Sequence, residues 1–198
     1  MQSLFLQMFT YIKAYYFAIV PTLTEKEWLV IESLFTIRAV KKGEVILANG
    51  KVCNHVSFLN KGVVRYFVNA KGKEISTGFV FSFGYISAYD SFLLRTPSID
   101  CMDALEDTEL IELSYDNLAY LYLHVPVAQI FGRLIAEKIF IELKLRGDAL
   151  LTLTPEERYV ELIDNNNILV QKVPQYMLAS YIGVTPEHLS RIRKKISK

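Results

Sequence analysis

The middle of the chain, from Lys41 to Ser114, consists of short runs in which apolar and polar residues alternate. Alternation of this kind, bounded by Gly and Asn, predicts half-buried β-strands. The turns between them are predicted at Lys61-Gly62 and, as a hairpin, at 69–72. The expected strands are 56–60, 63–68, 75–81, 99–105 and 108–114. Several short strands at this spacing are typical of a β-sandwich, barrel or roll.

Helical spacing flanks this region on both sides. Thr24 and Glu27 predict a capping box that opens a helix through about Leu34. Helical spacing returns at about Tyr115, and the segment 127–151 carries an apolar stripe wide enough to pack on its own domain and on a partner. The candidate dimer-interface residues are Ile130, Leu134, Ile141 and Leu145. Packing within one subunit explains the stripe equally well from the pattern alone.

A new helix is predicted directly after the long segment. Thr154 can cap a new helix, Pro155 suits its first turn, and Glu157 completes a second capping box. We therefore predict two domains, 1–151 and 152–198. The new helix is expected to end near Asp164 to Asn167, whose side chains favour turns.

The stretch PQYMLASYIGVTPEHLSRIRKKI, residues 174–196, contains two helical patterns on either side of Gly183. A helix-turn-helix needs a small residue where its helices cross, a Gly in the turn, and apolar residues at fixed offsets. Ala179 is the small residue, and Thr185 can cap the second helix. The core offsets are filled by Leu178, Ile182, Val184, Leu189 and Ile192. An ordinary helical hairpin would seldom fill every offset.

Polar side chains of the second helix are left to face outward. Glu187 can accept from a cytosine amine and Arg191, four residues later on the same face, can pair with guanine. The alternative for this pair is a surface salt bridge within the helix. Lys194 and Lys195 are expected to meet phosphates or to keep the end soluble. The candidate DNA-binding residues are Thr185, Glu187, His188, Ser190, Arg191, Lys194 and Lys195.

Charge supports this assignment only through its distribution. The chain has 198 residues with 22 Lys and Arg against 21 Asp and Glu, a formal net charge of +1. Residues 186–198 alone carry a net charge of +4, so the remainder sums to −3. The basic end is therefore local, as expected for a segment that meets nucleic acid.

The two cysteines, Cys53 and Cys101, make a disulfide framework or a thiolate metal site improbable. Cys53 and His55 are close in sequence, but two ligands do not make a metal site, and no metal or cofactor is expected. A reducing cytoplasm is the expected compartment. The apolar N-terminal stretch 3–21 contains Lys13 and lacks the flanks of a signal peptide. It predicts an amphipathic helix packed on the protein itself, with interfacial membrane binding as the alternative.

Across nearly its whole length the chain resembles the Crp/Fnr family of bacterial transcription regulators, in the short form common in Bacteroidetes. The resemblance rests on KKGEVILANGKVCNHVSFLNKGVVRYFV, GKEISTGFVFSFGYISAYDSFL, DALEDTELIELS, TPEERYVELI and the stretch from Val173 to Ile196. It implies an α+β fold with an N-terminal double-stranded β-helix (a jelly-roll-like β-roll of the cyclic-nucleotide-binding type) and a long dimerisation helix, about 125–151. An all-α helix-turn-helix domain with a reduced or absent wing would follow. It also implies a homodimer on a palindromic double-stranded DNA site, with RNA polymerase as a further partner.

The resemblance weakens at the family's effector pocket. Cyclic-AMP-binding members open the phosphate-binding segment with Gly-Glu and close it with an Arg before Ser or Thr. Here the opening reads Phe83-Gly84-Tyr85 and the closing end Pro97-Ser98-Ile99, with Arg95 out of register. A buried phosphate without its Arg is costly, so we expect weak or absent cyclic AMP binding. The candidate lining, which either holds a less charged effector or is filled by its own side chains, is Phe83, Gly84, Tyr85, Ser87, Tyr89, Ser98 and Ile99.

The two alternative classes of function are a sensing or interaction module and an enzyme. A ligand-sensing or protein-interaction module whose helix-turn-helix no longer binds DNA would share most of these features. An enzyme is disfavoured, because the sequence has no nucleophile–base pairing, no paired carboxylates in a recognisable context and no Gly-rich phosphate loop.

Overall fold

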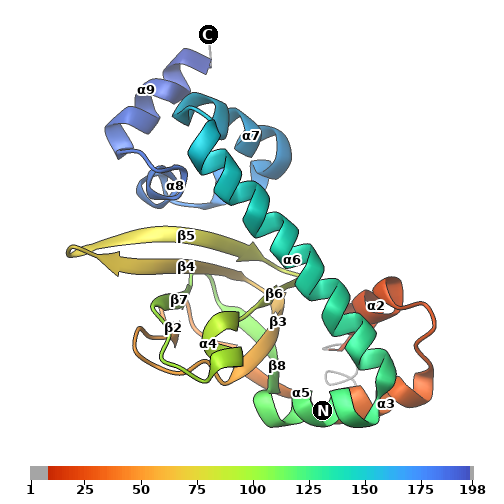
Figure 1. Cartoon of the computed structure of the whole chain (residues 1–198). Coiled ribbons are helices and arrows are strands. Elements are labelled where there is room, and N and C mark those ends of the chain that lie inside the picture. Colours follow the sequence, from red (N-terminus) through yellow and green to blue (C-terminus); the bar gives the residue numbers. More distant parts are fainter. Residues whose placement is uncertain (1–8, 197–198) are drawn as a thin grey trace. The chain divides into compact units, whose positions relative to one another are not determined.

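The computed structural model describes residues 9–196 (Figure 1). The chain forms two compact units. The first contains the chain up to Tyr66 and Val80–Glu137, and the second contains Phe67–Phe79 and the chain from Lys138 onward. The boundary between them therefore passes through two strands and the longest helix. The expected division into an effector domain and a DNA-binding domain at residue 152 is a functional one and stays a prediction.

Eight strands form two four-stranded sheets within the described residues. The first sheet has the order β1-β8-β3-β6 and the second β2-β7-β4-β5. The strands are β1 (Thr36–Val40), β2 (Val45–Leu47), β3 (His55–Lys61), β4 (Val63–Ala70), β5 (Lys73–Phe81), β6 (Gly84–Ile86), β7 (Asp100–Ala104) and β8 (Thr108–Ser114). All five expected strands are confirmed to within two residues. The three that sequence reasoning missed, β1, β2 and β6, have three to five residues each.

Both predicted turns are present. Gly62 joins β3 to β4 with φ +111°, and a Cβ added there would lie 2.3 Å from Thr108 Oγ1. Lys71 and Gly72 join β4 to β5 with φ values of +52° and +75°. Two successive positive φ values match the hairpin turns that follow the twist of the strands.

Apolar residues lie on both faces of the first sheet, because successive side chains of a strand point to opposite faces. One face, with Phe58 and Ile111, packs against α2 (Thr10–Ile19), α3 (Glu25–Ser33), α5 (Tyr115–His124) and the first part of α6 (Pro126–Thr152), which gather beside it in Figure 1. The other face, with Leu59 and Leu110, packs toward Val64 of the second sheet and Phe92. This unit also contains α4 (Tyr89–Leu94).

Helix boundaries follow the predicted caps. Thr24 Oγ1 accepts from the backbone N–H of Glu27, whose carboxylate accepts in return from the N–H of Thr24, and Thr154 and Glu157 repeat this arrangement. The N-terminal expectation holds for α2, which buries Ile12 and Tyr16 in the core of the first unit. The part of that expectation before residue 9 lies outside the described residues. No helix in residues 9–196 has the length and apolar character needed to cross a membrane.

The second unit is built from the rest of α6 and three further helices, together with the hairpin tip, Phe67–Phe79. The helices are α7 (Pro155–Lys172), α8 (Gln175–Ile182) and α9 (Pro186–Ile196). The expected end of the first helical segment at 164–167 coincides with a break at Asn166, which leaves helical geometry (φ −150°, ψ 58°). The second helical segment that follows and continues α7 through Lys172 was not predicted from the sequence. Burial of Leu169 gives the resumed helix a tertiary anchor that local propensity could not predict. Within the described residues, everything after β8 is helical or connecting loop.

Candidate functional site

The turn between α8 and α9 has the geometry that a helix-turn-helix requires. Gly183 ends α8 with φ +79° and donates its N–H to the carbonyls of Ala179 and Ser180. The N–H of Val184 also donates to the Ala179 carbonyl, which closes a left-handed cap of the kind Gly favours. Thr185 then caps α9, because its hydroxyl accepts from the N–H of His188 at 3.3 Å.

The predicted core positions pack as expected. Ala179 is fully buried where the helices approach closely, and Val184 is half-buried. The remaining predicted positions are buried, and so are residues of α7, the loop before α8 and α8 itself. These buried residues are Leu178, Ile182, Leu189 and Ile192 with Tyr159, Leu169, Val173 and Met177.

Glu187, Arg191 and Lys194 follow each other at spacings of four and three along α9 and are all exposed. They form a line opposite the buried Leu189 and Ile192. The pKa of Glu187 is lowered, first by backbone hydrogen bonding and then by the Thr185 hydroxyl, with a smaller effect of Arg191. Glu187 is therefore an ionised acceptor at neutral pH.

The other predicted DNA-binding residues differ in exposure. His188 and Ser190 flank the exposed line and are half-buried, whereas Thr185 is exposed at the start of the helix. Lys195 is exposed and lies 3.9 Å from Glu156 of α7. An exposed ion pair at this distance is worth little, so Lys195 can exchange it for a phosphate.

The predicted dimer-interface stripe on α6 is only partly exposed to solvent. Leu134 packs on the core of the first unit, whereas Ile130, Ile141 and Leu145 are exposed. Sequence reasoning missed a second exposed line on this helix, of which Phe140 is 70% and Leu143 64% exposed. The spacing 136, 140, 143, 147, 150 alternates four and three residues, the signature of a helix-pairing seam. The seam residues are Ala136, Phe140, Leu143, Gly147 and Leu150.

The residues predicted to line an effector pocket are not brought together in one place. Tyr85 lies on the face of β6 toward the helices, where its ring packs edge-on against Phe58 and Phe131 at centroid distances of 5.4 and 5.9 Å. Burial raises its pKa well above the ordinary value for tyrosine. Phe83, held at φ +73°, contacts Tyr11 of α2 in a tilted arrangement, with the ring centroids 4.4 Å apart. Gly84, between them, pairs with Leu59 of β3.

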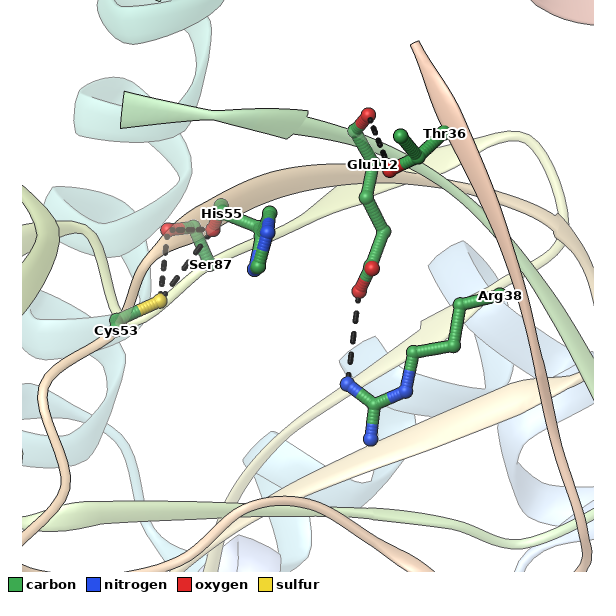
Figure 2. Close-up of polar contacts among 6 residues, drawn as sticks. All are labelled: Thr36, Arg38, Cys53, His55, Ser87 and Glu112. Atoms are coloured by element: carbon green, nitrogen blue, oxygen red, sulfur yellow. Dashed lines mark hydrogen bonds and ion pairs between the residues drawn. The ribbon is translucent and has the colours of Figure 1, made fainter. Parts of the chain in front are cut away.

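Ser87 lies apart from these aromatic residues. Its hydroxyl donates to the carbonyl of His55 at 3.1 Å and lies 3.5 Å from Cys53 Sγ, as Figure 2 shows. The N–H of Ser87 donates to the hydroxyl of Tyr66 at 2.8 Å, and burial raises the pKa of that tyrosine far above its ordinary value. The polar groups of Ser87 are thus engaged within the chain.

Ser98, Ile99 and Tyr89 complete the predicted lining. Ser98 is buried, and its hydroxyl donates to the Asp100 carbonyl and accepts from the Asp100 N–H. Ile99 is exposed, and Tyr89 stacks on Phe92 at 5.9 Å. Burial, and then the charge of Asp90, raises the pKa of the Asp100 carboxyl.

Arg95 does not replace the missing phosphate-binding arginine of this segment. It donates to the carbonyl of Cys53 at 2.9 Å and to Asn54 Oδ1 at 2.6 Å, and its guanidinium lies 4.4 Å from the centroid of the Tyr115 ring. These contacts fix it to the loop before β3 and to the start of α5.

A polar row on the inner face of the first sheet was missed from the sequence. Thr36, Glu112 and Ser57 stand opposite one another in register, and Arg38 pairs with the buried Glu112 at 3.6 Å (Figure 2). The alternation of β8 contained the signal, because Glu112 shares its face with the buried Leu110. This row places polar groups in the interior on the inner face of the first sheet.

Comparison with known proteins matches this architecture. Residues 37–124 match the family model of the cyclic nucleotide-binding domain. The c-di-GMP-responsive global regulator CLP of Xanthomonas campestris is 16% identical, with a TM-score of 0.71, over 88% of this chain and 92% of that chain. A transcriptional regulator of the Crp/Fnr family from Eubacterium rectale is 16% identical, with a TM-score of 0.70, over 92% of this chain and 88% of that chain.

A third solved structure, the catabolite activator protein of Thermus thermophilus, is 21% identical, with a TM-score of 0.54, over 89% of this chain and 84% of that chain. No curated protein matches the sequence. At such identities the likeness to solved structures establishes the fold, which agrees with the resemblance seen in the sequence. Residues 37–124 therefore match the cyclic nucleotide-binding domain model, and the chain has the fold seen in transcriptional regulators of the Crp/Fnr family.

Proposed function

We propose that this protein is a cytoplasmic transcription regulator that binds a palindromic DNA site as a homodimer. The observation that carries the proposal is the exposed line Glu187, Arg191 and Lys194 on α9, opposite a completely packed helix-turn-helix core. On this face of α9, one carboxylate and two cations are exposed and could meet base edges and phosphates. Residues 152–198 would be the DNA-binding domain, and residues 1–151 the effector domain. RNA polymerase is a further partner that the fold allows.

Dimerisation would use α6. Its exposed seam residues Phe140 and Leu143 are too large and apolar to remain in water without cost, and a second copy of the helix would cover them. Gly147 supports close pairing, since a Cβ added there would meet nothing within 4 Å. The predicted residues Ile141 and Leu145 lie on the opposite side of the helix and provide the alternative seam.

Cyclic AMP, if it were the effector, would lack the glutamate and arginine that hold it in cyclic-AMP-binding members of the family. Tyr85 is committed to an aromatic core, and Arg95 is engaged by backbone carbonyls and Tyr115. A cyclic phosphate placed between the sheets would meet the Glu112 carboxylate as well as Arg38. Because an uncompensated charge is costly to bury, we propose that the domain does not respond to cyclic AMP.

The test is a selection of binding sites from random DNA duplexes with the purified full chain and no added ligand. An enriched palindrome with half-sites about one helical turn, roughly 34 Å, apart is expected. Arg191→Ala is expected to weaken the enrichment of this palindrome. Lys26→Ala, which removes an exposed cation on α3, is the matched control and should enrich it like the wild type.

The competing function is a sensing or interaction module that has lost DNA binding. If the folded dimer enriches no sequence either alone or with a metabolite extract, and its residual DNA affinity does not depend on salt, that alternative replaces the proposal. Enrichment that appears only with the extract would retain DNA binding and show that an effector is required.

A further inference from the structure

Tyr181, on the last turn of α8, is held between two side chains from distant parts of the chain. The guanidinium of Arg146, on α6, lies 3.6 Å from the centroid of its ring. The ring of Phe79, on β5, meets it edge-on at a centroid distance of 5.4 Å. All three residues belong to the second unit. One aromatic ring therefore joins the helix-turn-helix to α6 and to the hairpin tip.

A hydrogen bond next to Tyr181 also joins α8 to the hairpin tip. The backbone N–H of Ser76, on β5, donates to Ser180 Oγ at 2.9 Å. Ser76 is itself buried, so this N–H has little access to water as an alternative partner. A buried backbone donor without a partner is expensive, which makes the Ser180 hydroxyl a specific acceptor and not a chance neighbour.

Two arginines also satisfy the exposed carbonyls at the end of α8. Arg146 Nη2 donates to the Tyr181 carbonyl at 3.0 Å, and Arg158 Nε donates to the Ile182 carbonyl at 3.0 Å. The last carbonyls of a helix have no partner within it, so such donors fix where the helix ends. Burial lowers the pKa of Arg146, and a guanidinium withdrawn from water binds an aromatic face more strongly.

From this geometry we propose that Tyr181 is a positioning residue that locks α8 onto α6 and the hairpin tip, so that α9 is presented to DNA in one orientation. The proposal rests on the proposed function and adds a residue that touches no DNA. Within the helix-turn-helix the lock involves only α8, and Glu187, Arg191 and Lys194 of α9 remain exposed. It therefore sets the direction of the recognition helix without blocking its face. In a dimer, the two directions together decide which half-site spacing can be bound.

The existence of the lock is tested without DNA, by amide hydrogen exchange at Ser76 in the full chain. Ser180→Ala removes the acceptor and suits a helix, so exchange at Ser76 is expected to accelerate about 2- to 10-fold, the range supplied by one net hydrogen bond. Tyr181→Leu is expected to accelerate it as well. Tyr176→Leu, on the same helix with a side chain that is 58% exposed, is the control and should leave it unchanged. Unchanged exchange in both test variants overturns the lock.

The positioning role is tested with palindromes whose half-sites differ in spacing by single base pairs, and with an isolated half-site. Tyr181→Leu is expected to weaken binding to the preferred spacing about 2- to 30-fold, the range of a cation–π contact, and to flatten the preference. Binding to the isolated half-site should persist, and Tyr181→Phe, which keeps the ring, should restore the preference.

The outcomes separate the two proposals. A spacing preference that survives in Tyr181→Leu, despite faster exchange at Ser76, overturns the positioning role and leaves a purely structural contact. If wild-type protein binds none of the duplexes, the proposed function fails and the positioning role fails with it, while the exchange data still report whether the contact exists.

Discussion

The ring of Tyr85 meets the ring of Phe58 edge-on, with their centroids 5.4 Å apart. Tyr15 and Phe131 contact the same ring at 5.8 and 5.9 Å, so Tyr85 belongs to an aromatic cluster beneath the helices of the first unit. The resemblance to cyclic-AMP-binding regulators placed this residue where the glutamate of their Gly-Glu pair would stand. In this chain the position contributes to packing, and its side chain is directed toward the core.

Replacing Tyr85 with glutamate should therefore destabilise the protein without creating cyclic AMP binding. An ionised carboxylate buried without a partner costs several kcal/mol, and the aromatic contacts would be lost in addition. Urea unfolding at neutral pH would measure the loss, with Tyr85→Phe, which keeps the ring, expected close to wild type. A stable Tyr85→Glu protein whose melting temperature rises with cyclic AMP would contradict the assignment.

Phe140→Glu should dissociate the proposed dimer. A carboxylate in the middle of an apolar seam opposes its copy in the other subunit, so the dimer dissociation constant is expected to rise at least about tenfold, or about 1.4 kcal/mol. Sedimentation over a range of concentrations measures it. Ile141→Glu, equally placed on the helix but on its other side, is the matched comparison. Dissociation by Ile141→Glu alone would move the interface to the line of Ile141 and Leu145.

Arg191→Ala should cost about 1–3 kcal/mol of affinity for the selected site and relax specificity at one base position. The reason is that a guanidinium can pair bidentately with guanine, whereas alanine reads no base. Binding to a set of single-base variants of the site measures both effects. An equal loss on every sequence would assign Arg191 to the phosphate backbone instead.

Lys194→Ala should weaken binding to all sequences alike. A lysine that meets a phosphate releases a counterion on binding, so the slope of log affinity against log salt should decrease by about one. Titrations at several salt concentrations provide the slope, with Lys26→Ala as the control. A change in base preference would show that Lys194 reads a base.

Asp100→Asn should stabilise the first unit at neutral pH. The pKa of the Asp100 carboxyl is raised above its ordinary value of 3.8, chiefly by burial and then by Asp90. The folded state thus binds this proton more tightly than the unfolded state does, so stability is lost as pH rises from about 3.8 through the raised value. The difference in urea midpoint between variant and wild type should grow over that window. A constant difference would show that Asp100 does not titrate with folding.

Local signals in the sequence determined most of the secondary structure. Capping boxes at Thr24 and Thr154 fixed where two helices begin, because a cap depends on residues only three apart. Gly62, Gly72 and Gly183 fixed the turns, because their positive φ values are accessible chiefly to glycine. The longer strands were predicted from the alternation of apolar and polar residues. The order of caps, turns and strands along the chain was sufficient to indicate the fold.

Tertiary structure decided everything that depends on partners far along the chain. The short strands β1, β2 and β6 are defined by their neighbours, since three to five residues are too few for a reliable period. Helical contacts decided that Tyr85 faces a core, and packing of Leu169 extended α7 beyond its kink. The contacts of Tyr181 with Arg146 and Phe79 join residues 35 and 102 positions apart. Periodicity describes how one element presents its faces, but it contains no information about which distant side chain will meet them.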